Sequence, residues 1–244
     1  MNLQRGSTTT EQTTAHADSL DWQDVDTVLF DMDGTILDLH FDNYFWEEYV
    51  PELYGQRHGL ATIEASALLR SRYEGVKGTL QWYCTDFWSD NLAMDIPRLK
   101  EDIRHRIAIR PTALEFVQQL RKSGRQVMLV TNAHPHSLAL KMRHTGIGSH
   151  FHHTISSHTF HLAKENDGFW QALRQAHDYE PGRTLLIDDS LAVLRQAQRE
   201  GIRHLRAIRQ PDSRRSALPA SEFVQLDDFS ALMQHLGQNK GTDR

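Results

Sequence analysis

The chain has 244 residues with 27 basic and 32 acidic side chains, which give a formal net charge of −5 at pH 7. This balance offers no basic field for nucleic acid, and no uninterrupted apolar run is long enough to cross a bilayer. The one cysteine, Cys84, excludes an internal disulfide framework and suits a reducing cytosol, so we expect a cytoplasmic protein without nucleic-acid or membrane partners. We interpret Cys84 as a small buried hydrophobic residue.

The first predicted strand ends in two aspartates. Residues 27–31 (TVLFD) are apolar β-formers without polar alternation, which is typical of a parallel strand covered on both faces. Ligands bind at the carboxyl ends of such strands, so we expect Asp31 and Asp33 to face a ligand. The alternative is a plain turn, because most Asp-Gly pairs are no more than that.

A long insertion follows this strand. Residues 39–109 are rich in aromatic residues and space their apolar residues as helices do, over a length far beyond an ordinary loop. We expect this segment to fold as a helical cap domain above Asp31 and Asp33. Such a cap could exclude water and supply substrate contacts.

The rest of the chain alternates strands and helices. Further strands are predicted at residues 126–131, 152–157, 183–188 and 202–208. Amphipathic helices are predicted between and after them, at residues 112–124, 135–147, 165–177 and 190–202. Gly124, Gly146 and Gly201 stand where left-handed helix caps are expected. The pattern predicts an α/β fold: a Rossmann-like parallel sheet, covered on both faces, with the helical cap inserted.

These elements define the expected domains. The core domain takes residues 22–38 and 110–236, and the cap domain takes residues 39–109. Residues 1–21 are rich in Thr, Gln and Ser and lack the apolar region of a secretory signal, so we expect a disordered tail. We expect the same of residues 237–244.

Polar residues follow the other strands at the same edge. Thr131 and Asn132 close the second strand, Lys164 lies in the loop after the third, and the pair Asp188-Asp189 closes the fourth. Singly these signals are weak, because most lysines are solvated and such Asp pairs often cap helices. Their coincidence at one edge predicts a site. Carboxylates gathered there repel one another unless a cation lies between them, and an all-oxygen site suits Mg²⁺.

This residue set suits the chemistry of a small phosphate ester. Asp31 could attack phosphorus and form an aspartyl-phosphate. Asp33 could protonate the leaving oxygen and then accept a proton from the attacking water. Thr131 and Asn132 would bind phosphoryl oxygens, and Lys164 would offset developing negative charge.

Histidines are abundant, with 15 in the chain and a concentration between His134 and His161. Their spacing matches no compact zinc motif, and the cysteines of such motifs are missing. The sequence therefore disfavours a zinc site.

The sequence resembles the haloacid dehalogenase superfamily. The four motifs of that superfamily occur in order as DMDGT (31–35), TNA (131–133), Lys164 and IDDS (187–190). The resemblance implies that Asp31 is the nucleophile and Asp33 the general acid and base. It also implies a Mg²⁺ site made by the Asp31 carboxylate, the Asp33 backbone carbonyl and Asp188, with Asp189 as a ligand or in the second shell. One departure is that Glu165 stands where a proline commonly follows the motif lysine.

A closer resemblance, to the bacterial GMP/IMP 5′-nucleotidases, extends from about Trp22 to the last helix. It rests on the stretches WQDVDTVLFDMDGTILDLHFDNYFW, LQWYCTDFWS, TNAHPHSLALKMRHTGI, SSHTF and TLLIDDS. This resemblance implies hydrolysis of purine nucleoside 5′-monophosphates to nucleoside and phosphate. Phosphatase activity on another small ester, such as a sugar phosphate or phosphoglycolate, is the alternative.

Polar residues at the start of the cap are candidates for substrate specificity. His40, Asp42 and Asn43 lie just beyond Asp33, at the expected entrance of the active site. Polar side chains that are buried there need hydrogen-bond or charge partners, and a substrate could supply them. Helix capping by Asp42 or Asn43 is the plainer alternative.

Three further residues are weaker candidates. His134 lies two residues after Asn132, and Pro135 could start a helix there. His134 therefore either contacts the phosphate or ribose of the substrate, or only caps this helix and packs against the protein. Trp82 and Tyr83 could stack on a purine, although aromatic residues at helical spacing more often form a domain's own core.

Other activities fit less well. A dehalogenase needs neither Mg²⁺ nor a second acid/base carboxylate, so Asp33 and Asp188-Asp189 argue against it. A mutase or phosphotransferase must keep water from its aspartyl-phosphate, whereas Asp33 is placed to activate water. A phosphonate hydrolase needs a cap lysine, and neither Lys77 nor Lys100 has an obvious place at the mouth. A non-enzymatic nucleotide-binding regulatory module would lack a nucleophile or metal ligand, and none is missing. The oligomeric state stays open, and a monomer is compatible with the sequence.

Overall fold

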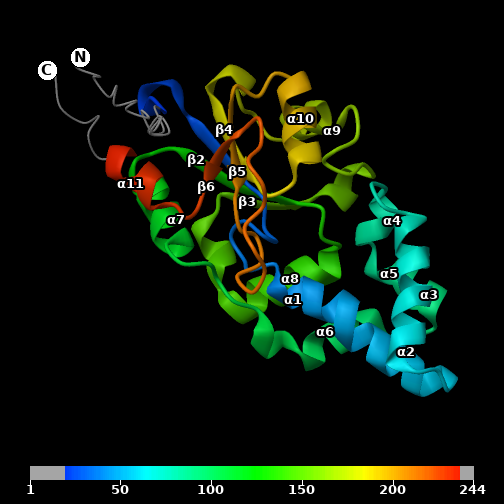
Figure 1. Cartoon of the computed structure of the whole chain (residues 1–244). Helices are drawn as coiled ribbons and strands as arrows, with labels where there is room; N and C mark the ends of the chain where they lie inside the picture. The colour runs from blue at the N-terminus through cyan, green and yellow to red at the C-terminus, as the bar shows by residue number, and fades with distance from the viewer. Residues whose placement is uncertain (1–19, 237–244) are drawn as a thin grey trace, which may run out of the picture.

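The computed structural model describes residues 20–236 and contains a six-stranded parallel sheet (Figure 1). The strands lie in the order β3-β2-β1-β4-β5-β6, so that β1 is central. Their bounds are β1 (Thr27–Phe30), β2 (Gln126–Thr131), β3 (His153–Ser156), β4 (Thr184–Asp188), β5 (His204–Ile208) and β6 (Val224–Leu226). The expected parallel sheet and its five strands are confirmed, and the edge strand β6 was not predicted.

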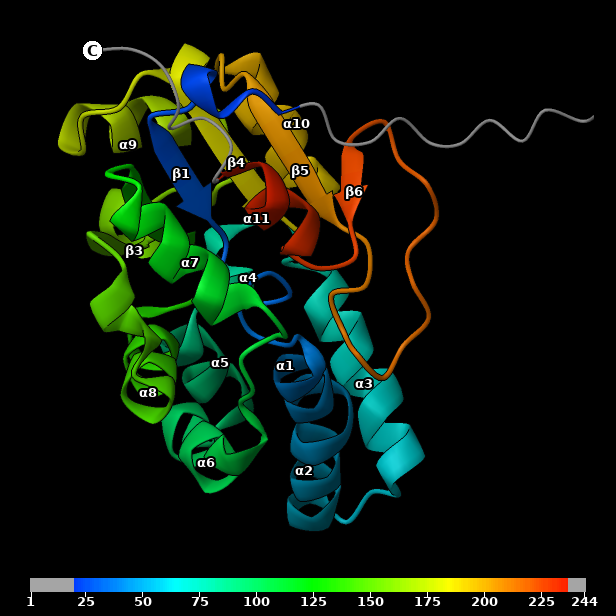
Figure 2. The same cartoon turned by 90° about the vertical axis from the view of Figure 1, so that its left-hand side faces the viewer.

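Helices cover both faces of the sheet (Figure 2). Because successive strand residues point to opposite faces, Val28 and Phe30 join the core cluster on one side, whereas Leu29 joins the cluster on the other. Phe30 packs edge-on against Phe116 and Phe229, at centroid distances of 5.8 and 6.0 Å. The core helices are α7 (Ala113–Lys122), α8 (Pro135–Thr145), α9 (Phe169–Ala176), α10 (Leu191–Arg199) and α11 (Ser230–Leu236).

The predicted glycine caps are confirmed. Gly146 ends α8 with φ of 68°, a left-handed conformation that L side chains rarely adopt, and its N–H donates to Met142 O at 2.9 Å. Gly124 and Gly201 also have positive φ, 83° and 94°, just beyond α7 and α10.

The inserted segment forms a group of helices below the carboxyl end of the sheet (Figures 1 and 2). It leaves and rejoins the core at one point, where Asp38 N donates to Ala108 O and Arg110 N donates to Ile36 O, both at 2.9 Å. The predicted cap boundaries fall at this pairing. Its helices are α1 (His40–Tyr44), a π-helical turn (Phe45–Tyr49), α2 (Val50–His58), α3 (Thr62–Glu74), α4 (Leu80–Tyr83), α5 (Thr85–Leu92) and α6 (Ile96–Asp102).

Two expectations need correction. The predicted tail of residues 1–21 includes Leu20 and Asp21, but Leu20 is buried in the core and the Asp21 carboxylate accepts a hydrogen bond from Gln23 N at 2.9 Å. Cys84 was expected to be buried and is only half-buried. The remaining tail predictions, for residues 1–19 and 237–244, lie outside the described residues. Within residues 20–236, no helix is long and apolar enough to cross a membrane.

Candidate active site

The turn after β1 places Asp31 and Asp33 at the carboxyl edge of the sheet. Asp31 continues the strand, since its N–H donates to Ile187 O at 2.9 Å. Gly34 then turns the chain with φ of 90°. A Cβ atom at Gly34 would lie 2.5 Å from Asp189 Oδ2, so only glycine lets the turn approach Asp189 so closely.

Lys164 joins the ends of β1 and β4. Its Nζ lies 2.5 Å from Asp31 Oδ1 and 2.7 Å from Asp188 Oδ2, and it also donates to Val130 O at 3.1 Å. Burial disfavours the ammonium form, but the two carboxylates outweigh it and raise the pKa of Lys164. Burial raises the pKa of Asp31 to about 6, against the lowering effect of Lys164. The lysine is therefore held as a cation against Asp31.

Asp31, Asp188 and Asp189 form an acidic cluster in which one oxygen of each lies within 4.8 Å of the others. Burial, and then the charges of Asp31 and Asp188, raise the pKa of Asp189 well above its usual range. A cation between the three groups would relieve this repulsion. Carboxylate oxygens are the donors that hard divalent cations prefer, so the residues present fit a divalent metal.

The loop after β2 is held by side-chain hydrogen bonds. Thr131 Oγ1 accepts from Ala133 N at 3.0 Å, and Asn132 Oδ1 accepts from Lys164 N at 2.8 Å. Asn132 Nδ2 donates to Glu165 Oε2 at 2.8 Å, and Tyr83 OH of the cap donates to Glu165 Oε1 at 2.9 Å. Glu165, where a proline is common, thus links the cap to the loop that carries Asn132.

A buried chain of charges runs from Asp33 into the cap. Lys141 Nζ lies 2.6 Å from Asp33 Oδ1 and 2.6 Å from Asp42 Oδ2, and Lys100 Nζ lies 2.7 Å from Asp42 Oδ1. Burial raises the pKa of Asp33 to about 6, with Lys141 acting in the opposite direction. Burial also acts to raise the pKa of Asp42, but Lys100 and Lys141 outweigh it and hold that pKa at about 2.

The edge of the sheet and the cap enclose a cavity of about 650 Å³. Most of the predicted site residues line it: Asp31, Asp33, Asp42, Asn43, Trp82, Tyr83, Thr131, Asn132, Lys164, Asp188 and Asp189. Trp46 and Tyr73 of the cap line it as well. The volume is ordinary for a small-molecule site.

The other residues predicted for substrate specificity, His40 and Asn43 of the cap and His134 of the core, have protein partners. His40 and His134 do not line the cavity: His40 Nδ1 lies 3.7 Å from Asp212 Oδ1, and His134 Nδ1 lies 2.8 Å from Thr85 Oγ1. Asn43 lines the cavity, but its Nδ2 donates to Asp212 Oδ2 at 2.7 Å. The side chains of these residues therefore face protein groups.

Sequence reasoning missed the lysines of the charge chain. Lys141 follows Ser137 by one helical turn, and both are buried beside Leu140 on the inner face of α8. A lysine on the buried stripe of a helix was the available signal, because such a residue needs a carboxylate partner. Lys77 and Lys100, which had no predicted place at the mouth, both line the cavity.

A protein-family model described as haloacid dehalogenase-like hydrolase matches residues 25–201. The chain belongs to this family. The GMP/IMP nucleotidases YrfG of Escherichia coli (strain K12) and Shigella flexneri are each 43% identical to it over 215 residues, which cover 88% of this chain and 97% of theirs. The expected superfamily and the expectation of a hydrolytic enzyme are confirmed.

Solved structures of this superfamily share the fold. The HAD phosphatase of Thermococcus onnurineus matches with a TM-score of 0.73 at 22% identity, covering 87% of this chain and 98% of that one. The HAD-hydrolase YfnB of Bacillus subtilis matches with a TM-score of 0.62 at 18% identity, covering 87% and 99%. At these identities the likeness shows the α/β core with its inserted cap.

Proposed function

We propose that this enzyme hydrolyses purine nucleoside 5′-monophosphates, GMP and IMP among them, to nucleoside and phosphate with Mg²⁺. The observation that carries the proposal is the Asp31 carboxylate fixed by Lys164 at the base of the cavity, with Asp33 two residues further along. The 43% identity to the two GMP/IMP nucleotidases supports the choice of nucleotide. We keep the cytoplasmic location as a prediction.

In the first step a carboxylate oxygen of Asp31 attacks phosphorus, and the bond to the 5′-oxygen breaks. Lys164 keeps Asp31 oriented at 2.5 Å and offsets the charge that develops on the phosphoryl oxygens. The 5′-oxygen leaves with a proton from Asp33. A pKa of about 6 suits Asp33 to this role, because a general acid works best when its pKa lies near the working pH.

In the second step water attacks the phosphorus of the aspartyl-phosphate, and the bond to Asp31 breaks. Asp33, now ionised, accepts the proton of that water, so that both carboxyl groups return to their initial states. Lys141 stabilises the ionised form of Asp33 at 2.6 Å. The cap above the cavity limits access of bulk water.

Asp31, Asp188 and Asp189 would hold the Mg²⁺, together with the backbone carbonyl of Asp33. When bound, the metal neutralises charge on the phosphoryl group and orients it toward Asp31. Among cap residues, Trp46, Trp82 and Tyr83 present aromatic surface to the cavity, where a purine base could stack.

Inorganic phosphate release from GMP, IMP, AMP, CMP, glucose 6-phosphate and phosphoglycolate tests the proposal. The assay compares wild type with Asp31→Asn, in Mg²⁺ and in EDTA. Asp178→Asn is the matched control, because Asp178 is exposed and does not line the cavity. We expect release led by GMP and IMP, lost in EDTA and in Asp31→Asn, and unchanged in the control.

The other outcomes separate the parts of the proposal. If phosphate release is fastest from glucose 6-phosphate or phosphoglycolate, the proposed mechanism stands and the proposed substrate is wrong. Activity that survives both EDTA and Asp31→Asn would refute the mechanism itself.

A further inference from the structure

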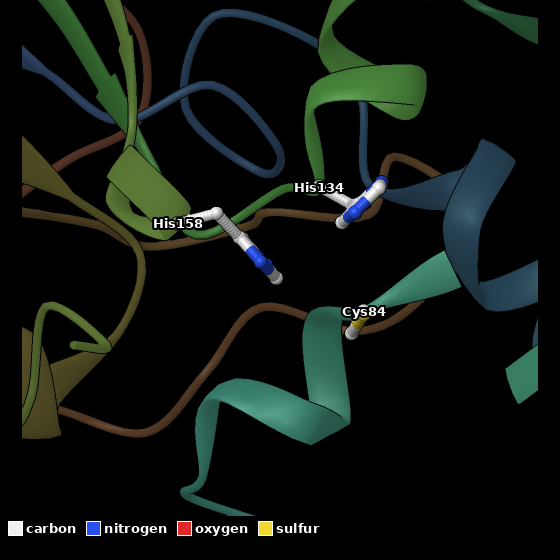
Figure 3. Close-up of side chains that lie close together, drawn as sticks. All are labelled: Cys84, His134 and His158. Atoms are coloured by element: carbon white, nitrogen blue, oxygen red, sulfur yellow. The ribbon is translucent and has the colours of Figure 1, made fainter. Parts of the chain in front are cut away.

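Cys84, His134 and His158 form a cluster beside the cavity, at the interface between cap and core (Figure 3). Cys84 lies in the cap between α4 and α5, His134 precedes α8, and His158 follows β3. One ligand atom from each residue lies within 4.8 Å of the other two. None of the three lines the cavity, so the cluster is separate from the acidic cluster.

We propose that Cys84, His134 and His158 bind a divalent transition metal of the zinc type, which joins the cap to the core. One thiolate with two imidazoles is a donor set that such metals prefer, whereas Mg²⁺ prefers oxygen. A tetrahedral zinc places sulfur and nitrogen ligands about 3.3–3.6 Å apart. The three ligand atoms lie within 4.8 Å of one another, so displacements on the order of 1 Å would bring them to these separations.

His158 supplies an independent indication. Its Nε2 is fully buried and has no hydrogen-bond partner among the described residues. A buried polar atom without a partner costs free energy, and a bound metal would satisfy it. His158 also packs edge-on against the His134 ring, at a centroid distance of 4.8 Å, so its imidazole already faces the second proposed ligand.

The surroundings of the other two ligands are also suitable. His134 Nδ1 lies 2.8 Å from Thr85 Oγ1, and its Nε2 lies 3.6 Å from Asp86 Oδ2. If one ring nitrogen of His134 binds the metal, the other still has a polar neighbour, either Thr85 or Asp86, which fixes the orientation of the ring. Cys84 Sγ accepts a hydrogen bond from Phe87 N at 3.5 Å, a role that a metal-bound thiolate can keep.

The cluster could not be predicted from the sequence, because its three residues come from separate segments and form no compact motif. Cys84 directly follows Tyr83, which lines the cavity and bonds to Glu165 of the core. A metal on Cys84 would therefore hold this part of the cap against the loops after β2 and β3.

The test is a titration of the full-length protein with Co²⁺, in excess Mg²⁺ to occupy the acidic cluster. Because Cys84 is the only cysteine of the chain, any thiolate-to-cobalt charge-transfer absorption reports this residue alone. We expect a near-ultraviolet band that saturates near a single equivalent and is displaced by Zn²⁺. Neither the band nor its displacement depends on the proposed phosphatase activity.

Variants define the ligand set. Cys84→Ser should abolish the band, and His134→Ala and His158→Ala should each weaken Co²⁺ binding at least tenfold. His144→Ala is the matched control, because His144 is exposed on α8 and belongs to none of the candidate metal groups among the described residues. Circular dichroism without metal checks that each variant folds. No band in wild type, or an unchanged affinity in His158→Ala, would overturn the proposal.

A second readout needs no variant. Zn²⁺ should slow alkylation of the Cys84 thiol in wild-type protein at least tenfold, since a metal-bound sulfur is shielded from the reagent. An unchanged alkylation rate at saturating Zn²⁺ would also overturn the proposal.

Discussion

Asp42 is the counter-charge for two buried lysines between cap and core. Its carboxylate lies 2.7 Å from Lys100 and 2.6 Å from Lys141, whose side chains are 4% and 1% exposed. Asp42→Asn keeps the shape of the side chain and removes its charge. Lys141 then retains only Asp33, and Lys100 loses its one ion-pair partner among the described residues. We expect this variant to lose stability.

The magnitude follows from the pKa and from burial. A pKa of Asp42 lowered from 3.8 to about 2 corresponds to roughly 2–3 kcal/mol of native-state stabilisation at neutral pH. Removing one partner of a buried ion pair costs about 3–5 kcal/mol. We expect Asp42→Asn to lower the free energy of unfolding by about 2–4 kcal/mol, and the thermal midpoint by about 5–15 °C.

The loss should depend on pH with a definite sign. Because the folded pKa of Asp42 lies below its unfolded value of 3.8, the stabilisation is complete above that value and disappears as the pH falls toward 2. Thermal and urea unfolding of wild type and Asp42→Asn between pH 7 and pH 3 measures this. Asp90→Asn, at an exposed position of the same cap, should change little. An Asp42→Asn midpoint within 1 °C of wild type at pH 7 would refute the reasoning.

Two further substitutions test the site itself. Lys141→Met removes the cation 2.6 Å from Asp33, so the pKa of Asp33 should rise. Because the first step needs Asp33 protonated, the basic limb of the kcat/KM–pH profile should move up by about one unit or more. An unmoved basic limb would refute the role of Asp33 as the general acid. Gly34→Ala puts a Cβ 2.5 Å from Asp189 Oδ2 and should raise the Mg²⁺ concentration needed for half-maximal activity. Gly59→Ala is its control, because it shares the positive φ but has nothing within 4 Å of the added Cβ. Equal effects of both glycine variants would point to backbone strain alone.

The centre of the sheet could be predicted because β1, β2 and β4 are buried on both faces. Val28, Leu29 and Phe30 are all fully buried, so the run shows no polar alternation and is distinct from a half-exposed strand. The edge strand β6 has only three residues, with Val224 exposed, and carries no comparable pattern. Burial on both faces therefore made the central strands recognisable, whereas β6 has neither that burial nor the length to show a pattern.

The polar residues of the site could be predicted because they follow those strands directly. Parallel strands place their carboxyl ends at the same edge of the sheet. Asp31, Thr131 and Asp188 therefore reach that edge however the helices pack. Lys141 lies inside a helix, and its contact with Asp33 depends on how α8 packs against the turn after β1. The sequence pattern does not fix that packing angle. It can therefore indicate that the buried Lys141 needs a carboxylate partner, but not that the partners are Asp33 and Asp42.

Asp42 shows why the cap is harder to interpret than the core. Its polarity at a buried mouth needs an explanation, and a contact with the substrate was one answer. The structure supplies another, because Lys100 and Lys141 compensate the charge from within the protein. The physical rule that a buried carboxylate needs a partner holds in both cases. Sequence alone leaves open whether the partner is a ligand or another side chain, because that choice depends on which helices the cap brings against α8.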